Sequence, residues 1–148
     1  MRKLILGTEA SISSLILRLA LGIVIFPHGA QKVLGWFGGY GLSATLNTFT
    51  ETMGIPLFFA VLAVSAEFLG SIGLIVGFLT RIAALGIGSV MVVAALMVHL
   101  PNGFFMNWYG NQKGEGFEYH ILATAIALAL IIKGGGSWSI DRYLTRKR

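Results

Sequence analysis

The chain has 148 residues, of which 55% are hydrophobic and 11% charged, and its formal net charge is +5. A typical soluble domain has about 25% charged residues, so this composition supplies too little polar surface to cover a soluble fold. We therefore expect a membrane protein built as one domain, residues 1–148. The chain has no cysteine, which excludes disulfides, thiolate metal ligands and thiol redox chemistry, so electrons would need an external carrier.

The positive charge is concentrated at the two ends of the chain. Six of the eleven Lys and Arg residues flank apolar segments there: Arg2, Lys3, Arg142, Arg146, Lys147 and Arg148. Basic residues at the ends of apolar segments are typical of membrane proteins, whereas proteins that bind nucleic acid gather them in a patch or stripe. We therefore expect no nucleic-acid partner.

Four apolar segments are each close to the roughly twenty residues that cross a bilayer as a helix. Their approximate limits are Ser14–Val33, Pro56–Phe78, Arg81–Leu100 and Phe117–Lys133. Between the first two, apolar residues recur at helical spacing, which predicts a short helix on the membrane surface within Gly41–Gly54. The sequence thus predicts an all-α transmembrane four-helix bundle with a short interfacial helix between spans 1 and 2.

The basic residues also predict an orientation. Most of them fall on the side of the membrane that holds both termini, and only Lys32 and Lys113 fall on the other. Because cytoplasmic loops carry the excess of Lys and Arg, both termini should be cytoplasmic in a multi-pass protein of the inner cell membrane. The two long connections then face outward, and their aromatic residues, Trp36 and Trp108 among them, form an interfacial belt.

Polar side chains within the apolar segments are the main functional signal. A charged group at membrane depth costs at least about 2.5–3.5 kcal/mol, so it needs a partner or a task. One set of polar residues, drawn from three helices, converges on the outer third of the bundle: His28, Gln31, Lys32, His99, Glu118 and His120. Lone histidines are usually hydrogen-bonded core residues, but here all three histidines of the chain lie at one depth. We interpret this convergence as a site that opens outward.

Helical spacing predicts which of the charged side chains point inward. Stripes of small residues place Glu67 and His99 in the bundle interior. Arg18 shares a face of the first segment with Lys32, and we expect its long side chain to reach up and pair with Glu67. For Lys32 two interpretations stay open, a residue of the site or an end-of-helix lysine whose ammonium lies among the headgroups.

The fourth segment presents a choice of face. Glu118 and His120 are two residues apart, so on a regular helix they point to opposite sides. We expect Glu118 to face inward and His120 to serve the neighbouring helix. The inward stripe should then continue through Leu122, Ala125 and Ala129.

An imidazole, an ammonium and a carboxylate at a membrane interface can donate hydrogen bonds to carbonyl oxygens and move protons, as the reduction of a quinone requires. The sequence therefore predicts a membrane oxidoreductase component that exchanges electrons and protons with a quinone or quinone-like aromatic. We expect it to lie in the lipid bilayer as one component of a redox assembly with a partner subunit. The expected catalytic residues are His28, Lys32, Glu67, His99 and Glu118. The expected binding residues are Arg18, Gln31, Trp36, Trp108 and His120.

Two other classes of function stay open. His28, His99 and Glu118 are acceptable metal ligands, and a haem between His28 and His99 is geometrically conceivable, although the sequence has no metal-spacing motif. The remaining alternative is a non-catalytic scaffold or small-solute carrier, because four short helices leave little room for a cofactor and a substrate together. Glycine-bearing helix faces would support a homo-oligomer.

Several segments resemble the DoxX family of small four-helix membrane proteins. The similar stretches cover most of the chain: RLALGIVIFPHGAQKVLG from Arg18, AEFLGSIGLIVGFLTRIAA from Ala66, WYGNQKGEGFEYHILA from Trp108 and GGGSWSIDR from Gly134. The resemblance implies a membrane oxidoreductase, in a family named after the small subunit of a thiosulfate:quinone oxidoreductase. The positions that match the family pattern are Arg18, His28, Gly29, Lys32, Glu67, Arg81, Glu118 and Asp141. For Asp141 we expect a local helix cap or a neutraliser of Arg142.

Overall fold

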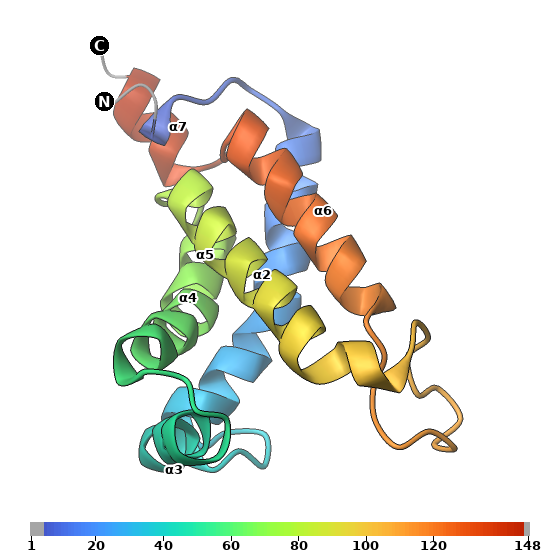
Figure 1. The fold of residues 1–148 in the computed structure, drawn as a ribbon. Helices are drawn as coiled ribbons and strands as arrows, with labels where there is room; N and C mark the ends of the chain where they lie inside the picture. Colours follow the sequence, from blue (N-terminus) through green and yellow to red (C-terminus); the bar gives the residue numbers. More distant parts are fainter. Residues whose placement is uncertain (1–4, 147–148) are drawn as a thin grey trace.

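The computed structural model describes residues 5–146, and every regular element in that range is a helix (Figure 1). The all-α class is therefore confirmed. The helices are α2 (Ile12–Leu34), α3 (Gly41–Asn47), α4 (Leu57–Val76), α5 (Thr80–Ala94), α6 (Glu118–Lys133) and α7 (Ile140–Arg146). The terminal basic residues Arg2, Lys3, Lys147 and Arg148 lie outside the described range.

The molecule has two distinct ends. The segment before α2, the turn between α4 and α5, and α7 lie at one end, which we call the α7 end (Figure 1). The short helix α3, which continues into the π-helical turn η1 (Thr48–Thr52), lies at the opposite end together with the long loop before α6, and we call this the α3 end. The short helix predicted between the first two spans is therefore confirmed.

The helix boundaries follow from local sequence signals. The Ser11 side chain caps α2 by accepting a hydrogen bond from the Ser14 N–H at 3.2 Å, and Gly35, with φ of 72°, ends the same helix. Gly77, with φ of 70°, ends α4 in the left-handed region that glycine adopts without strain. A turn of three residues then leads directly into α5, so α4 and α5 form a hairpin of helices.

Three helical segments are long and apolar enough to cross a membrane: Ile12–Leu34, Leu57–Val76 and Thr80–Asn102. The third is α5 continued by the π-helical turn η2 (Ala95–His99) and the 3-10 turn η3 (Leu100–Asn102). α6 has 16 residues, about 24 Å at a rise of about 1.5 Å per residue, which is less than the roughly 30 Å of a hydrocarbon core. The fourth predicted span is thus a helix of the bundle, shorter than the other three.

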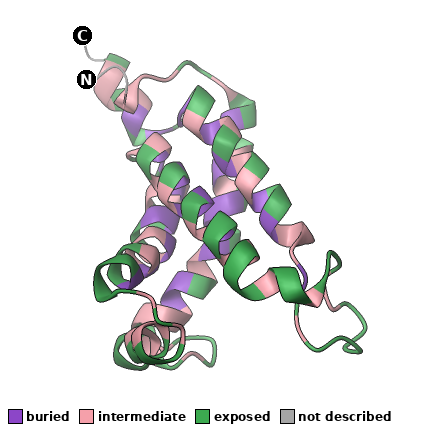
Figure 2. Ribbon diagram, in the orientation of Figure 1, coloured by how far each residue is buried: buried purple, intermediate pink, exposed green. Residues whose placement is uncertain are grey.

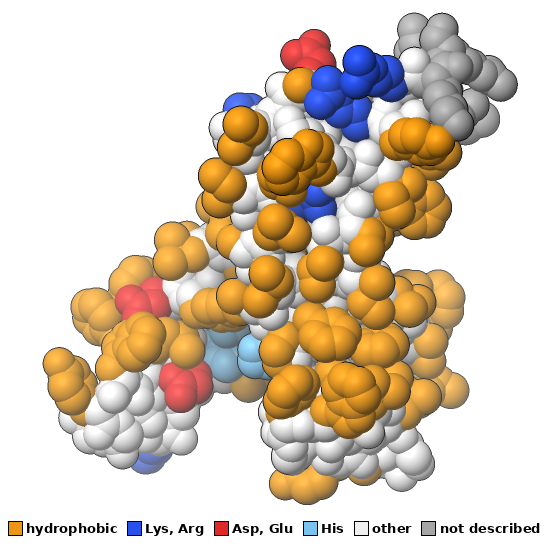
Figure 3. Space-filling model, turned by 180° about the vertical axis from the view of Figure 1, so that it is seen from behind, with side chains coloured by type: hydrophobic (Ala, Val, Ile, Leu, Met, Phe, Trp, Pro, Cys, Tyr) orange, Lys and Arg blue, Asp and Glu red, His pale blue; other side chains and the backbone are white. Residues whose placement is uncertain are grey.

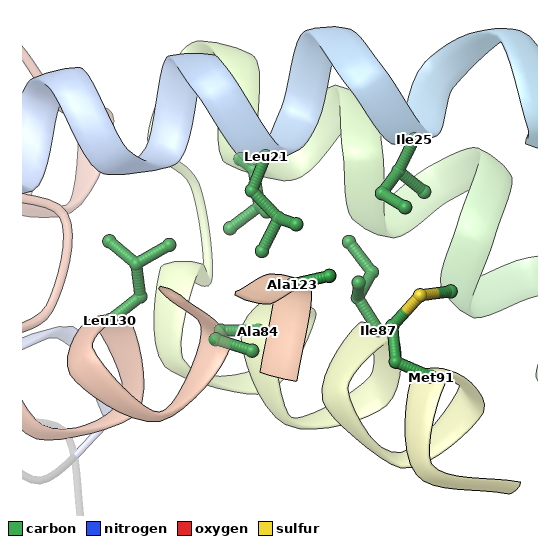
Figure 4. Packing of buried hydrophobic residues seen from close by; sticks show 9 residues of the cluster. Leu21, Ile25, Ala84, Ile87, Met91, Ala123 and Leu130 are labelled. Carbon is green, nitrogen blue, oxygen red and sulfur yellow. The ribbon is translucent and has the colours of Figure 1, made fainter. Parts of the chain in front are cut away.

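The core lies where the four long helices face each other, and Figure 2 shows the buried residues concentrated on these facing sides. Figure 4 shows the cluster from close by, with Leu21 and Ile25 of α2 beside Ile87 and Met91 of α5 and Ala123 of α6. Large apolar side chains such as Phe58, 68% exposed, and Leu122, 65% exposed, cover the outside instead (Figure 3). Large apolar side chains that face outward, around a core that mixes alanines with Leu, Ile and Met, are the arrangement expected of helices that pack in lipid.

Candidate functional site

Lys32 and Glu67 form an ion pair between α2 and α4. The Lys32 Nζ lies 2.7 Å from the Glu67 Oε2, and the two side chains are 25% and 7% exposed. The expectation that Arg18 pairs with Glu67 is therefore wrong, because Lys32 occupies that position. The Lys32 ammonium turns into the bundle to meet the carboxylate, so it neutralises a charge that burial would otherwise make costly.

A glycine contact sets the level at which this pair forms. A Cβ added at Gly29 of α2 would lie 2.6 Å from the Phe68 Cα and 2.8 Å from the Glu67 carbonyl carbon, so only glycine lets the two backbones approach this closely. Gly29 therefore places Glu67 opposite the last turns of α2. Lys32 is three residues further along the same helix, within one turn of Gly29.

Arg18 performs a different task at the α7 end. It is 2% exposed, and its guanidinium donates hydrogen bonds to backbone carbonyls at the end of α4 and in the turn before α7. The acceptors are the carbonyl oxygens of Leu74, Ile75, Gly135, Ser137 and Trp138. Arg18 precedes Lys32 by fourteen residues, roughly 21 Å along the helix, so its role is to hold the α7 end together and it is not part of the outer site.

Asp141 also belongs to the α7 end. Its two carboxylate oxygens accept hydrogen bonds from the backbone N–H groups of Leu79 and Thr80, at 2.8 and 2.9 Å. The carboxylate therefore caps the N-terminus of α5, where unpaired N–H groups and the helix dipole favour negative charge. Asp141 is a cap as predicted, but it caps a helix 61 residues earlier in the chain and not its own.

The His99 ring of η2 and the His120 ring of α6 lie against each other in a tilted arrangement. Their ring centroids are 4.1 Å apart with an interplanar angle of 38°. His99 ends the π-helical turn η2, and its Nδ1 lies 2.8 Å from the Glu115 carbonyl oxygen. A π-helical turn inserts an extra residue into the helical repeat, and such turns often occur at functional sites.

The inward face of α6 differs from the predicted one. The buried residues of α6 are His120, Ala123, Ala127 and Leu130. Leu122 and Ala125, on the predicted inward stripe with Glu118, are exposed. His120 therefore points into the bundle, and the prediction that Glu118 takes this position is wrong.

Glu118 instead organises the loop that precedes its own helix. Its Oε1 accepts hydrogen bonds from the Met106 backbone N–H at 2.9 Å and from the Trp108 Nε1 at 3.0 Å. The loop is further held by Glu115, whose Oε2 accepts from the Asn107 N–H at 2.7 Å. Trp108 is thereby fixed in orientation, although its ring is 78% exposed.

Two other predicted binding residues lie in the last turn of α2 and in the loop that follows it. Gln31 donates from its Nε2 to the Phe37 carbonyl oxygen at 3.0 Å, so its amide holds the loop after α2. Trp36, on this loop, is 54% exposed. Neither the Gln31 nor the Trp36 side chain takes part in the Lys32–Glu67 ion pair or in the contact between the His99 and His120 rings.

Tyr119 is a residue near the histidines that the sequence did not indicate. Its ring meets the His120 ring edge-on at a centroid distance of 5.4 Å. Its hydroxyl interacts electrostatically with the Glu67 carboxylate. The buried Tyr119 hydroxyl and the buried His120 Nδ1 have no hydrogen-bond partner among the described residues. The signal was the EYH triplet at the start of α6, in which an aromatic hydroxyl accompanies the histidine into the bundle.

Electrostatic interactions link the ion pair and the histidine pair into one group, which we call the polar cluster. His28 is close enough to Lys32 and Glu67 for their charges to act on its ring, and His120 interacts electrostatically with both His28 and His99. Figure 3 shows histidine side chains in the hollow between the two lobes at the α3 end. The polar cluster consists of His28 and Lys32 of α2, Glu67 of α4, His99 of η2, and Tyr119 and His120 of α6.

The polar cluster has hydrogen-bonding capacity to spare. A buried imidazole nitrogen and a buried hydroxyl without partners are costly unless a ligand or water satisfies them. Within residues 5–146 no three His, Asp or Glu side chains gather as a metal-ligand group, so His28, His99 and Glu118 do not form the ligand set considered above.

Comparison with known proteins identifies the family. The family model DoxX matches residues 13–100. An Escherichia coli protein named "Inner membrane protein YqjF" is 29% identical over 90% of this chain and 92% of its own length. The Bacillus subtilis protein "Putative oxidoreductase CatD" is 31% identical over 80% of this chain and 78% of its own, and a Mycobacterium tuberculosis membrane protein, Rv3486, is 30% identical over 97% and 88%. No solved structure gives a significant match.

The chain therefore belongs to the DoxX family, and it is a membrane protein with several apolar helices.

Proposed function

We propose that this DoxX family protein is a membrane oxidoreductase component that exchanges electrons and protons with a quinone or a quinone-like aromatic at the polar cluster. One relative carries an oxidoreductase name, which supports the class of activity. The choice of a quinone rests on one observation, the two buried polar atoms of Tyr119 and His120 that have no hydrogen-bond partner among the described residues. A lipid-soluble ring with carbonyl oxygens is the ligand chemistry that such donors fit.

The residues of the polar cluster have different roles in binding the ring. The Tyr119 hydroxyl and the His120 Nδ1, in the tautomer that carries a proton there, donate hydrogen bonds to a ring oxygen. The His99 ring, whose Nδ1 is hydrogen-bonded to the Glu115 carbonyl oxygen, lies against the His120 ring and holds it in place. Lys32 carries the positive charge that stabilises negative charge developing on the ligand, and Glu67 keeps that ammonium inside the bundle.

Protons need a route between this interior and water. A bound quinone supplies the redox chemistry, taking up two electrons and two protons to become a quinol. His28 is exposed and lies within electrostatic range of Lys32, Glu67 and His120, so its ring can pass a proton between the surface and the interior. The chain has no cysteine, and the electrons come in this proposal from a reduced redox partner protein.

Removing one hydroxyl tests the proposal. Tyr119→Phe deletes an oxygen that has no partner in the described chain, so folding should not suffer, whereas binding of a ring oxygen should weaken about fivefold. Tyr109→Phe is the matched control, because the Tyr109 ring is 91% exposed in the loop. Both variants and the wild type are purified in mild detergent, and bound quinone is extracted with organic solvent and counted per chain.

We expect quinone in the wild type and in Tyr109→Phe and clearly less in Tyr119→Phe, with unchanged unfolding. Equal quinone content in all three proteins would contradict the assignment of Tyr119, and a wild type without quinone would contradict the proposed function. Absorption spectra and elemental analysis of the same samples separate the alternatives. A haem band or stoichiometric metal would favour a metal or haem protein, and a colourless protein without metal, quinone or turnover would favour a scaffold or carrier.

A further inference from the structure

A second polar site lies at the α7 end, far from the polar cluster. The segment before α2, the first turn of α5, the end of α6 and α7 enclose a groove of about 1340 Å³. Four cationic side chains line it, and Figure 3 shows Lys and Arg side chains gathered at this end of the molecule. The four are Arg81, Lys133, Arg142 and Arg146.

The charge of the groove is unbalanced. One acidic residue, Glu9, lines it against the four cations, and within residues 5–146 no carboxylate comes within ion-pair distance of any of the four. Arg81 donates to the carbonyl oxygens of Ile131 and Gly7, which orients its guanidinium without cancelling the charge, and its buried Nε has no partner in the described chain. The groove therefore favours an anionic occupant.

The position of the groove indicates where that anion comes from. Arg81 lies in the first turn of the α5 span and Lys133 is the last residue of α6, so both stand at the level where apolar helix gives way to headgroups. Ile132, 73% exposed, lines the same groove and belongs to the apolar outer surface. An occupant with both a phosphate and an acyl chain matches these two linings together.

We propose that this groove binds the headgroup of an anionic phospholipid. Its phosphate interacts with Lys133, Arg142 and Arg146, and the start of an acyl chain lies beside Ile132. The inference goes beyond the proposed quinone chemistry and does not depend on it, because it uses none of the residues of the polar cluster. The lipid would hold the described segment before α2 against α6 and α7, since all three line the groove.

The proposal is tested by measuring how much anionic lipid the protein retains. The full chain is reconstituted into nanodiscs of phosphatidylcholine with and without phosphatidylglycerol, and native mass spectrometry counts the lipids that stay bound after ejection. Each basic side chain contributes about fivefold to attraction of anionic lipid, so the double variant Arg142→Gln, Arg146→Gln should bind phosphatidylglycerol about 25-fold more weakly. The charge-preserving pair Arg142→Lys, Arg146→Lys should retain most of the binding, because attraction to a headgroup phosphate depends mainly on charge.

Lys113→Gln is the control, because it removes an exposed cation at the α3 end and should leave retention unchanged. Thermal unfolding in phosphatidylcholine discs verifies that each variant is folded. Equal retention by the wild type and the double Gln variant, or equal retention of phosphatidylcholine and phosphatidylglycerol, would overturn the proposal. Stabilisation by inorganic phosphate in detergent as large as that by phosphatidylglycerol would assign the groove to a soluble anion instead of a lipid.

Discussion

Arg18 shows how this protein keeps a permanent charge inside an apolar bundle. The guanidinium has no carboxylate within ion-pair distance among the described residues, and backbone carbonyls of α4 and of the turn before α7 solvate it. These carbonyls lie at the end of α4 and in a turn, where regular helical hydrogen bonding stops. The Leu74 oxygen also accepts from the Gly77 N–H, at 3.2 Å. Arg18 and the carbonyls therefore satisfy each other, and the side chain joins three parts of the α7 end.

Replacement of Arg18 should cost more stability than most single substitutions. Arg18→Gln leaves several buried carbonyl oxygens without donors, so we expect the free energy of unfolding to fall by at least about 3 kcal/mol. Arg18→Lys should also destabilise, because an ammonium cannot reproduce the planar set of donors. Equilibrium unfolding in mixed micelles measures both variants, and a loss below about 1 kcal/mol for Arg18→Gln would contradict this role.

At the same scale, the polar residues of the site could be predicted but their partners could not. Depth along the helices predicted that the three histidines and Lys32 converge, and the stripe of small residues placed Glu67 in the bundle interior. The register of α4 along α2 determines whether Arg18 or Lys32 pairs with Glu67. That register depends on the close backbone contacts at glycines of α2. A Cβ at Gly22 would lie 3.0 Å from the Ser71 carbonyl oxygen, as Gly29 lies against Phe68, and together these contacts put Glu67 beside Lys32.

At the scale of elements, the glycine contact between α2 and α4 controls the site. Gly29→Ala brings a methyl group to 2.6 Å from the Phe68 Cα, so the helices must separate. We expect a loss of about 1–3 kcal/mol in the free energy of unfolding and a weaker Lys32–Glu67 pair.

Gly70→Ala is the matched control for this substitution. Its added Cβ meets the flexible Ile87 side chain at 3.4 Å and the Ala83 carbonyl oxygen at 3.6 Å, which is ordinary contact. Alanine also favours the helix, so stability should stay within about 1 kcal/mol of the wild type. Urea or SDS titrations of both variants compare them directly. Equal stability of Gly29→Ala and Gly70→Ala would show that the close approach at Gly29 does not limit packing.

The rotation of α6 about its own axis, which sets the face that it buries, could not be predicted from the sequence. The hydropathy of the sequence located all four long helices within a few residues. α6, however, has alanines on both candidate stripes, Ala123 and Ala127 on one and Ala125 and Ala129 on the other. Small residues therefore could not indicate its inward face, and the loop that Glu118 holds is a tertiary feature without a periodic signal.

At the scale of the whole molecule, the distribution of charge predicts how the protein sits in the membrane. Basic residues gather at the α7 end, which should therefore be cytoplasmic, with the polar cluster nearer the outer surface. The chain has no cysteine, so in a single-cysteine variant a thiol reagent labels the introduced residue alone.

Ala10→Cys at the α7 end and Gln112→Cys in the loop at the α3 end are both exposed positions. A membrane-impermeant maleimide added to intact cells should label Gln112→Cys, and it should label Ala10→Cys only after lysis. The opposite pattern would reverse the orientation and place the lipid groove in the outer leaflet.

Photolabelling with an azido-quinone, followed by peptide mapping, tests the central proposal most directly because it locates the bound ring on the chain. We expect labels on the segment of α2 that contains His28 and Lys32 and on the start of α6 at Tyr119 and His120, and unlabelled quinone should suppress them. Labels that are confined to the α7 end, or that persist undiminished in excess unlabelled quinone, would contradict a quinone site at the polar cluster.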